Sequence, residues 1–521
     1  MGKKWWTLLA VSLGTFMLLL DITIVTVALP AIQHDLHASF SDLQWTIDAY
    51  ALTLAALLLT AGSLADMFGR RRLFAIGLVL FTLGSLLCGA ATSPFFLVIA
   101  RSAQGLGGGA MFATSLALLA HAFRGRDRAT AFAVWGSVVA VAVAVGPLLG
   151  GILTTDLSWR WIFFVNVPVG IVALVITVIR VVESRQPGAP RPDWSGFVLF
   201  SSALIALVYG LIRASQTSWT DTGVIACFAS AVVLAGTFVV AERRSRHPMF
   251  DLGLFRVPTF DGSLLANFAI AASAFSLLLY LVLYLQDALG YTPLQSGVRM
   301  LVISGATFAT SALAGRLTNK VPARWLISPG LLGVGVGLLL IAHLHADSTW
   351  TALVPGLILT GLGSGMVNPP LASVAVGVVE PHRAGMASGI NNTFRQVGVA
   401  TGIAALGSIF ATREAGALTD AMRRTPGLAH LFPAVAAGVR SGATAAQIGA
   451  HVPARLRPAL DLALRTAFVR GLNEIVAIGG VIAIVGAVAT FALIRSRDIV
   501  SGSHDAVDVP EHTTEVPVGI G

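Results

Sequence analysis

Long apolar stretches alternate with short polar stretches along nearly the whole chain. Most of the apolar stretches run for about twenty residues or more with few charges, which is the length that an α-helix needs to cross the hydrocarbon core of a bilayer. The pattern therefore predicts an all-α polytopic membrane protein with fourteen spans, at residues 5–29, 43–63, 73–92, 95–120, 130–153, 161–182, 194–212, 222–241, 260–285, 296–316, 325–344, 352–377, 386–411 and 471–494.

The composition supports this interpretation. Only 11% of the 521 residues are charged and 55% are hydrophobic, whereas a soluble domain carries roughly 25% charged residues. The 54 glycines suit the close helix–helix approach that membrane bundles use. The first apolar stretch is too long for the core of a signal peptide, so we expect it to be retained as the first span.

The charges fall in short clusters between the spans. The net charge is +9, but the arginines form no continuous basic face, so we expect no nucleic-acid partner. Loops on one side hold most of the clusters, and the positive-inside rule places these loops and both termini in the cytoplasm of a cell (inner or plasma) membrane. A stretch at 412–470 carries eight arginines and should face outward; long loops cross largely regardless of charge.

Two sequence segments recur at an offset of about 255 residues. Gly105–Met111 returns as Gly361–Met366, and Gly62–Asp66 returns in degraded form as Gly315–Asn319. The alternative is chance similarity between glycine-rich helices. A true repeat predicts two six-helix bundles with two inserted helices, which is the architecture of an alternating-access transporter. The expected domains are 1–190, 191–257, 258–498 with the long outer loop 412–470, and a disordered cytoplasmic tail at 499–521, which is polar and acidic.

Two ionisable residues lie inside predicted spans. Asp21 is in the first span and Arg101 is in the fourth. A charged group at the bilayer centre costs on the order of 2.5–3.5 kcal/mol on insertion scales, and such groups are typical of proton relays. Burial favours the protonated form of a carboxyl group, whereas a nearby cation favours the charged form. We therefore predict that Asp21 and Arg101 couple the protein to protons; the alternative is a structural pair.

Two glycine-containing segments predict conformational devices. Between the second and third spans, Gly62, Asp66, Gly69 and Arg70 could form a latch: the glycines permit a tight turn, and an acidic side chain is favoured at a helix N-terminus. The alternative is a generic positive-inside anchor. In the fifth span a proline should kink the helix beside a face of small residues, although packing alone would also explain them: Gly146, Pro147, Gly150 and Gly151.

Other polar residues within the spans are candidates for the lining of a central cavity, each with a purely structural alternative. The chain shows no phosphate-binding loop and no Cys/His cluster with metal-ligand spacing, so we predict no cofactor, no metal and no enzymatic activity. The candidates are Asp48, Asn267, Asn368, Asn391, Asn392, Arg395 and Glu474.

Taken together, these segments resemble the major facilitator superfamily, and specifically its fourteen-span drug:proton antiporters. The resemblance implies a cavity that opens alternately to each side, with proton entry driving efflux. Asn is usual in that family where Thr26 stands here. The segments that carry the resemblance are Leu20–Pro30, Gly62–Leu73, Leu97–Gly109, Gly136–Gly151, Trp159–Pro168, Tyr284–Tyr291 and Ala387–Gly398.

Three functions remain open from the sequence. The leading hypothesis is a multidrug efflux pump for amphipathic, often cationic compounds, acting with protons, as a monomer and without an ATPase partner. The second is a dedicated exporter of one metabolite, such as an antibiotic, siderophore or lipid. The remote third is a membrane-embedded sensor or enzyme.

Overall fold

The protein is described from a computed structural model. The described residues are 2–123, 125–184, 193–245, 252–318, 320–379, 384–425, 428, 431–440 and 452–498. For a few residues within these ranges, including Gly62 and Asp66, only the backbone is described. The predicted boundary at residues 190 and 191 and the predicted tail at 499–521 also lie outside it.

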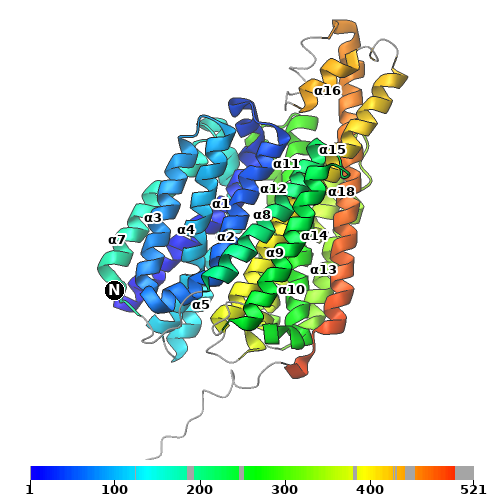
Figure 1. The fold of residues 1–521 in the computed structure, drawn as a ribbon. Helices are drawn as coiled ribbons and strands as arrows, with labels where there is room; N and C mark the ends of the chain where they lie inside the picture. Colours follow the sequence, from blue (N-terminus) through cyan, green and yellow to red (C-terminus); the bar gives the residue numbers. More distant parts are fainter. Residues whose placement is uncertain are drawn as a thin grey trace, which may run out of the picture.

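The first bundle is built from long helices that run back and forth between two ends (Figure 1). We call the end at which Leu36 lies the distal end; the N-terminus lies at the other end. The helices are α1 (Lys3–Leu36), α2 (Phe40–Phe68), α3 (Arg70–Gly89), α4 (Pro94–Ala122), α5 (Gly125–Asp156), and the short α6 (Trp161–Phe164) followed by α7 (Asn166–Arg180).

Two inserted helices and a second bundle follow. The inserted pair is α8 (Trp194–Gln216) and α9 (Thr222–Arg244). The second bundle begins with η1 (Leu252–Arg256) and one span made of α10 (Pro258–Ile270), the π-helix η2 (Ala271–Phe275), α11 (Ser276–Leu283) and the π-helix η3 (Tyr284–Ala288). It continues with α12 (Pro293–Leu317), α13 (Arg324–Ile341), η4 (Trp350–Leu353), α14 (Val354–Gly377), α15 (Ala384–Arg424), α16 (Phe432–Arg440), η7 (Ala454–Leu456), α18 (Arg457–Leu493) and η8 (Ser496–Asp498).

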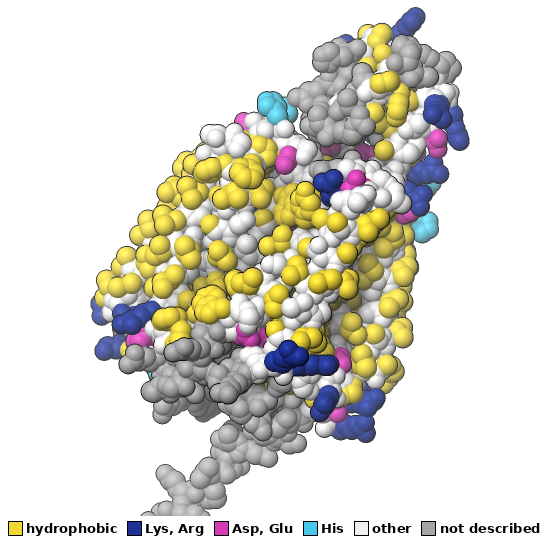
Figure 2. All heavy atoms as spheres, viewed as in Figure 1, with side chains coloured by type: hydrophobic (Ala, Val, Ile, Leu, Met, Phe, Trp, Pro, Cys, Tyr) yellow, Lys and Arg dark blue, Asp and Glu magenta, His cyan; other side chains and the backbone are white. Residues whose placement is uncertain are grey.

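The number of spans agrees with the sequence. Thirteen helices in the described part of the chain are long and apolar enough to cross a membrane, and α2, with 29 residues, stands between the first and second of them as one more long helix. Hydrophobic side chains cover the middle of the visible face, and Lys and Arg gather toward its ends (Figure 2). The predicted all-helical polytopic fold is confirmed.

Local signals in the sequence begin several helices. Ser39 and Asp42 form a reciprocal capping box at the start of α2, which satisfies backbone donors that a helix end leaves free. At α4, Ser93 accepts a hydrogen bond from Phe96 N, and Pro94 occupies the first turn, where its missing N–H costs nothing. These caps explain why the chain turns sharply between neighbouring spans.

The internal repeat has a structural counterpart in the packing of glycines. Gly105 of α4 meets the Tyr50 carbonyl of α2, and Gly107 meets α3. In the second bundle Gly361 of α14 meets the Ile303 carbonyl of α12, and Gly363 meets α13. Because corresponding glycines contact corresponding helices, the two bundles share one packing scheme.

The inserted helices cover part of the line where the bundles meet. Helix α8 packs against α9, against α2 of the first bundle and against α15 of the second. On α9, Val232 is 72% exposed and Val233 is 66% exposed, as expected for a helix that faces lipid.

The stretch 412–470, expected as a long loop, is helical over much of its length. Helix α15 continues to Arg424, and α18 already begins at Arg457. With α16 these helices project beyond the distal end (Figure 1). Leu418, Met422 and Leu460 belong to a small apolar core of their own there, which is why this polar-looking stretch holds helical structure.

Candidate functional site

Asp21 and Arg101 meet in the interior of the first bundle. Helix α1 carries Asp21 and α4 carries Arg101, and Arg101 Nη1 lies 2.5 Å from Asp21 Oδ2. The two side chains are 0% and 2% exposed. An ion pair this deeply buried is strengthened by the low dielectric but also pays a desolvation cost. Its polar atoms therefore need further partners.

Gln104 supplies much of this support. It stands one helical turn after Arg101 on α4 and is completely buried. Its Nε2 donates to Asp21 Oδ1 at 2.8 Å, and its Oε1 accepts from Arg101 Nη1 at 2.7 Å. One amide thus bridges both members of the ion pair.

Helices α2, α3 and α7 complete the cluster. Arg101 Nε donates to the Thr46 carbonyl at 3.1 Å, and its guanidinium lies 4.1 Å from the centre of the Tyr50 ring. Asn166 Nδ2 donates to Ser85 Oγ at 3.0 Å and lies 3.3 Å from Asp21 Oδ1. Residues of five spans therefore form one cluster around the Asp21–Arg101 pair.

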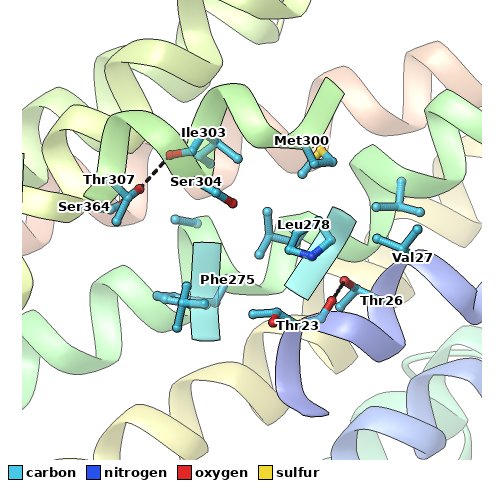
Figure 3. A pocket seen from close by; sticks show the side chains of 14 residues that line it. Thr23, Thr26, Val27, Phe275, Leu278, Met300, Ile303, Ser304, Thr307 and Ser364 are labelled. Atoms are coloured by element: carbon cyan, nitrogen blue, oxygen red, sulfur yellow. Dashed lines mark hydrogen bonds between the residues drawn. The ribbon is translucent and has the colours of Figure 1, made fainter. Parts of the chain in front are cut away.

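Two cavities lie between the bundles and share part of their walls. One is lined by α1, α5, η2, α11, α12 and α14, and Figure 3 shows its polar rim, including Thr23, Thr26, Ser304 and Thr307. The other is lined by α1, α2, α4, α5, η2 and α15. Phe275 lines both. Such a chamber, mostly apolar with a few polar groups, has the character of a small-molecule site.

Asp21 lies behind the wall of the second cavity. It lines neither cavity, whereas Arg101 and Tyr50 both line the second one. The guanidinium therefore stands between the carboxylate and the cavity. A change in the charge of Asp21 would be felt in the cavity through Arg101.

Arg395 is the second cation of this cavity. It lies on α15, and its guanidinium carbon is 4.6 Å from the centre of the Phe275 ring. Asn392 and Gln396 of the same helix line the same wall. Among the candidates for cavity lining proposed from the sequence, Asn392 and Arg395 are the ones that the described cavities contain.

The other candidates lie elsewhere. Asn267 Nδ2 donates to the Asn391 carbonyl at 3.2 Å, and Asn391 Nδ2 donates to Ser263 Oγ at 2.8 Å. Asn368 Nδ2 donates to the Ser364 carbonyl of its own helix at 3.0 Å. These contacts within the second bundle hold α10 against α15 and support α14.

The two acidic candidates differ from each other. Asp48 of α2 is completely buried, and neither of its carboxyl oxygens has a hydrogen-bond partner among the residues that the structure describes. Glu474 Oε1 lies 2.8 Å from Arg413 Nε, and both side chains are substantially exposed. Glu474 thus pairs with α15 away from the described cavity walls.

The turn between α2 and α3 is held by a residue that the sequence did not single out. Glu183, after α7, accepts hydrogen bonds from Arg71 N at 3.0 Å and Arg72 N at 3.2 Å. Its carboxylate occupies the space where a side chain at Gly69 would stand, and Gly69 has a φ of +106°. Arg70 N donates to the Ser184 carbonyl at 2.9 Å. A carboxylate at this helix N-terminus is favoured by the helix dipole.

Two residues of the predicted latch, Gly62 and Asp66, are described by their backbone alone. For Gly62 and Asp66 the structure gives the helical backbone of α2 and no more. The predicted latch role of Gly62 and Asp66 therefore stays a prediction.

The small residues of α5 make close contacts on two sides. A Cβ on Gly146 would overlap Thr23 of α1, and one on Gly150 would lie 2.7 Å from the Ile24 carbonyl. One on Gly151 would lie 2.7 Å from the Pro293 carbonyl, at the start of α12 in the other bundle. The Pro147 carbonyl faces Gly297 of α12. Helix α5 thus touches both bundles at this level.

Sequence reasoning found the ion pair and missed its supports. Ser85, Gln104 and Asn166 are uncharged, so neither a hydropathy profile nor a charge count marks them. One signal was present: Gln104 follows Arg101 by three residues, which places both on one face of a helix.

Known proteins match this chain over most of its length. The family model described as "Major Facilitator Superfamily" matches residues 11–403. "Multidrug resistance protein Stp" of Mycobacterium tuberculosis is 39% identical over 86% of this chain and 84% of its own. "Tetracenomycin C resistance and export protein" of Streptomyces glaucescens is 35% identical over 93% and 91%.

Solved structures share the fold at low identity. A bacterial homologue of the human lysosomal transporter Spinster, in an inward-facing and occupied conformation, superposes with a TM-score of 0.64 at 16% identity, covering 95% of this chain and 98% of that chain. A D-xylose–proton symporter gives a TM-score of 0.60 at 12% identity, covering 94% and 98%. At such identities the likeness concerns the fold alone.

Proposed function

Because this chain belongs to the major facilitator superfamily, we propose that it is a proton-coupled exporter of small amphipathic, drug-like compounds. The observation that carries the proposal is the buried Asp21–Arg101 pair directly behind the wall of a cavity between the two bundles. The names of the relatives, which include a multidrug resistance protein and an antibiotic export protein, support the direction of transport.

The coupling step follows from the geometry of the pair. A proton that binds Asp21 removes the charge that holds Arg101 in place. Arg101 then keeps Gln104 and the Thr46 carbonyl as hydrogen-bond partners, and its positive charge is no longer compensated. Because Arg101 lines the cavity, this change alters the electrostatic potential that a substrate meets there and favours the alternate conformation.

The available energy is sufficient for export. One proton that moves down 100 mV gains about 2.3 kcal/mol, and one pH unit adds about 1.4 kcal/mol. The sum sustains a gradient of a neutral substrate of roughly 500-fold.

The proposed setting is the cell membrane, with both termini in the cytoplasm. The arginine clusters of the loops support this orientation, and the turn at Arg70–Arg72 is the strongest of them. We propose a single chain that works without an ATPase partner.

The direct test is Asp21→Asn in proteoliposomes with an imposed proton gradient. Export of a panel of aromatic dyes should fall at least about tenfold, because a residue that cannot bind a proton breaks the coupling. Exchange of dye across the membrane without a gradient should continue, because the cavity itself is intact. Gradient-driven export at the wild-type rate in this variant would contradict the assignment.

Asp35→Asn is the matched control. Asp35 lies on the same helix and pairs with Arg160 at the same N–O distance of 2.5 Å, but its side chain is 46% exposed at the distal end. A surface pair of this kind contributes about 0–1 kcal/mol, so this variant should export at the wild-type rate.

A dedicated metabolite exporter is the second candidate. The tetracenomycin C export protein is covered over 91% of its length, which favours this alternative as a specialised form of the same activity. Screening deletion strains for one retained metabolite, beside the dye panel, separates the two.

A further inference from the structure

The cavity that Arg395 lines carries an uncompensated positive charge. The structure gives Arg395 no hydrogen bond and no ion pair within the part of the chain that it describes; its one recorded partner is the Phe275 ring. Arg101, the other cation of this wall, is neutralised by Asp21. No acidic side chain is among the described residues that line either cavity.

A guanidinium in this position has unused binding capacity. It carries five N–H donors and no acceptor, and its planar fork matches the two oxygens of a carboxylate or the oxygens of similar anions. A charge taken out of water is costly unless it is paired. A bound anion would supply the partner that the described protein residues do not.

The surroundings of Arg395 favour a flat aromatic ligand. Phe275 stacks against the guanidinium and faces the cavity that Figure 3 shows, and Tyr50 of α2 lines the same cavity as Arg395. Aromatic side chains bind aromatic ligands through offset stacking. Asn392 and Gln396, which flank Arg395 on α15, add amide groups suited to carbonyl or hydroxyl substituents.

Tight helix packing fixes the position of the pair. A Cβ on Gly398 would lie 2.8 Å from the Phe268 carbonyl, and one on Gly402 would lie 2.8 Å from Ala272 Cα. Phe275 ends the π-helix η2, an irregularity that often marks functional sites in helices. Arg395 and Phe275 are thus held together by the backbone of α15 and η2.

We propose that Arg395, stacked on Phe275, is an anion-binding subsite, and that the exported compounds include planar aromatic molecules with a carboxylate or an ionised phenol. The inference rests on the proposed export function and specifies its substrate class. It differs from the cationic drugs expected from the sequence, because a cation in this cavity would meet a like charge without an acidic partner.

The test uses three probes with one ring system: anthracene-9-carboxylate, 9-anthracenemethanol and 9-(aminomethyl)anthracene in its ammonium form. Their binding to the full-length protein is measured in detergent at neutral pH by fluorescence titration. No gradient is present, so the result does not depend on proton coupling. The wild type should bind the anion at least about tenfold more tightly than the cation, which is the value expected for a hydrogen-bonded charge pair.

Arg395→Gln should remove this preference while binding of the neutral alcohol stays within about twofold. Arg395→Lys should keep part of it, because the charge remains and the planar fork is lost. Arg299→Gln is the matched control: Arg299 also stacks on an aromatic ring, 3.7 Å from the centre of Tyr291, but it lines neither cavity. Its variant should bind all three probes as the wild type does.

Two results would overturn the proposal. One is a wild type that binds anion and cation equally. The other is an Arg395→Gln variant that weakens all three probes alike, which is the signature of a structural role. Failure of dye export in proteoliposomes with intact anion preference in detergent would contradict the proton-driven function and leave this subsite standing.

Discussion

Two buried carboxyl groups on neighbouring helices have opposite surroundings. Asp21 accepts hydrogen bonds from Arg101 and Gln104, whereas Asp48 is equally buried and its two oxygens have no hydrogen-bond partner. A buried polar group without a hydrogen-bond partner destabilises the folded state. An aspartate on α1 and an aspartate on α2 are therefore expected to contribute differently to the stability of the fold.

This contrast predicts opposite effects of one substitution. Asp48→Asn replaces an unpartnered acid by a neutral group of similar size, so the melting temperature in detergent should stay the same or rise. Asp21→Asn removes the counter-charge of a buried guanidinium, so the melting temperature should fall while the protein remains folded. A lower melting temperature for Asp48→Asn would show that Asp48 has a stabilising partner.

At the scale of single residues, the sequence identified the buried charged side chains but missed the residues that contact other parts of the site. Asp21 and Arg101 stand out because each interrupts an apolar span, and their pairing could be anticipated. Glu183 could not, because it lies far along the chain, in a segment that looks like an ordinary polar loop. Its role at the N-terminus of α3 depends on where α7 ends in space.

The helices of both bundles approach one another through glycines in equivalent places. Gly150 of α5 packs on α1, and Gly402 of α15 packs on η2 of the corresponding span. Small residues allow backbones to come close in lipid, where no hydrophobic effect drives helices together. The glycine pattern therefore sets the distance between the helices that carry the cavity walls.

Gly150→Leu tests this packing. The new side chain would collide with the Ile24 backbone, which cannot move aside as a side chain can, and overpacking of this kind costs typically 1–3 kcal/mol. The melting temperature and dye export should both fall. A Cβ on Gly136 of the same helix would meet no described atom within 4 Å, so Gly136→Leu should leave both unchanged. Equal losses in the two variants would contradict the explanation.

Hydropathy predicted the helices of the two bundles correctly, but it missed the helical structure that projects beyond them. Spans are identified by apolar length, which the bilayer imposes, so their number and order could be predicted. The helical projection of α15, α16 and α18 was missed because it carries arginines, prolines and glycines instead of an apolar run. Its small apolar core around Leu418 and Met422 emerges only when distant segments pack together.

Three of the hydrogen bonds that the described residues form between the bundles lie toward the distal end. Gln286 Nε2 donates to the Val27 carbonyl at 2.8 Å, and Gln44 Nε2 donates to the Ile403 carbonyl at 3.0 Å. Leu294 N donates to Thr155 Oγ1 at 3.0 Å. These contacts hold the two bundles together toward the distal end, and the proposed alternating-access cycle would have to break them.

A cross-link across this seam should therefore stop transport. With Thr155→Cys and Leu294→Cys combined, mild oxidation should form a disulfide, because the two positions are already in hydrogen-bond contact. Dye export in proteoliposomes should fall to background and return on reduction. The variants that carry only one of the two substitutions serve as controls, since the chain also contains Cys88 and Cys227. Normal export by the cross-linked protein would show that this seam does not open.

Helix α15 is the one element that extends from the cavity wall into the projection beyond the distal end. It runs without interruption for 41 residues, about 60 Å at 1.5 Å per residue, and Arg395 lies in its first third. If a helix of that length tilts as a rigid body by about five degrees about one end, its other end moves by about 5 Å. An antibody fragment or envelope component that binds the projection would therefore also restrict the movement of Arg395. Binding at this remote surface would in this way affect the cavity.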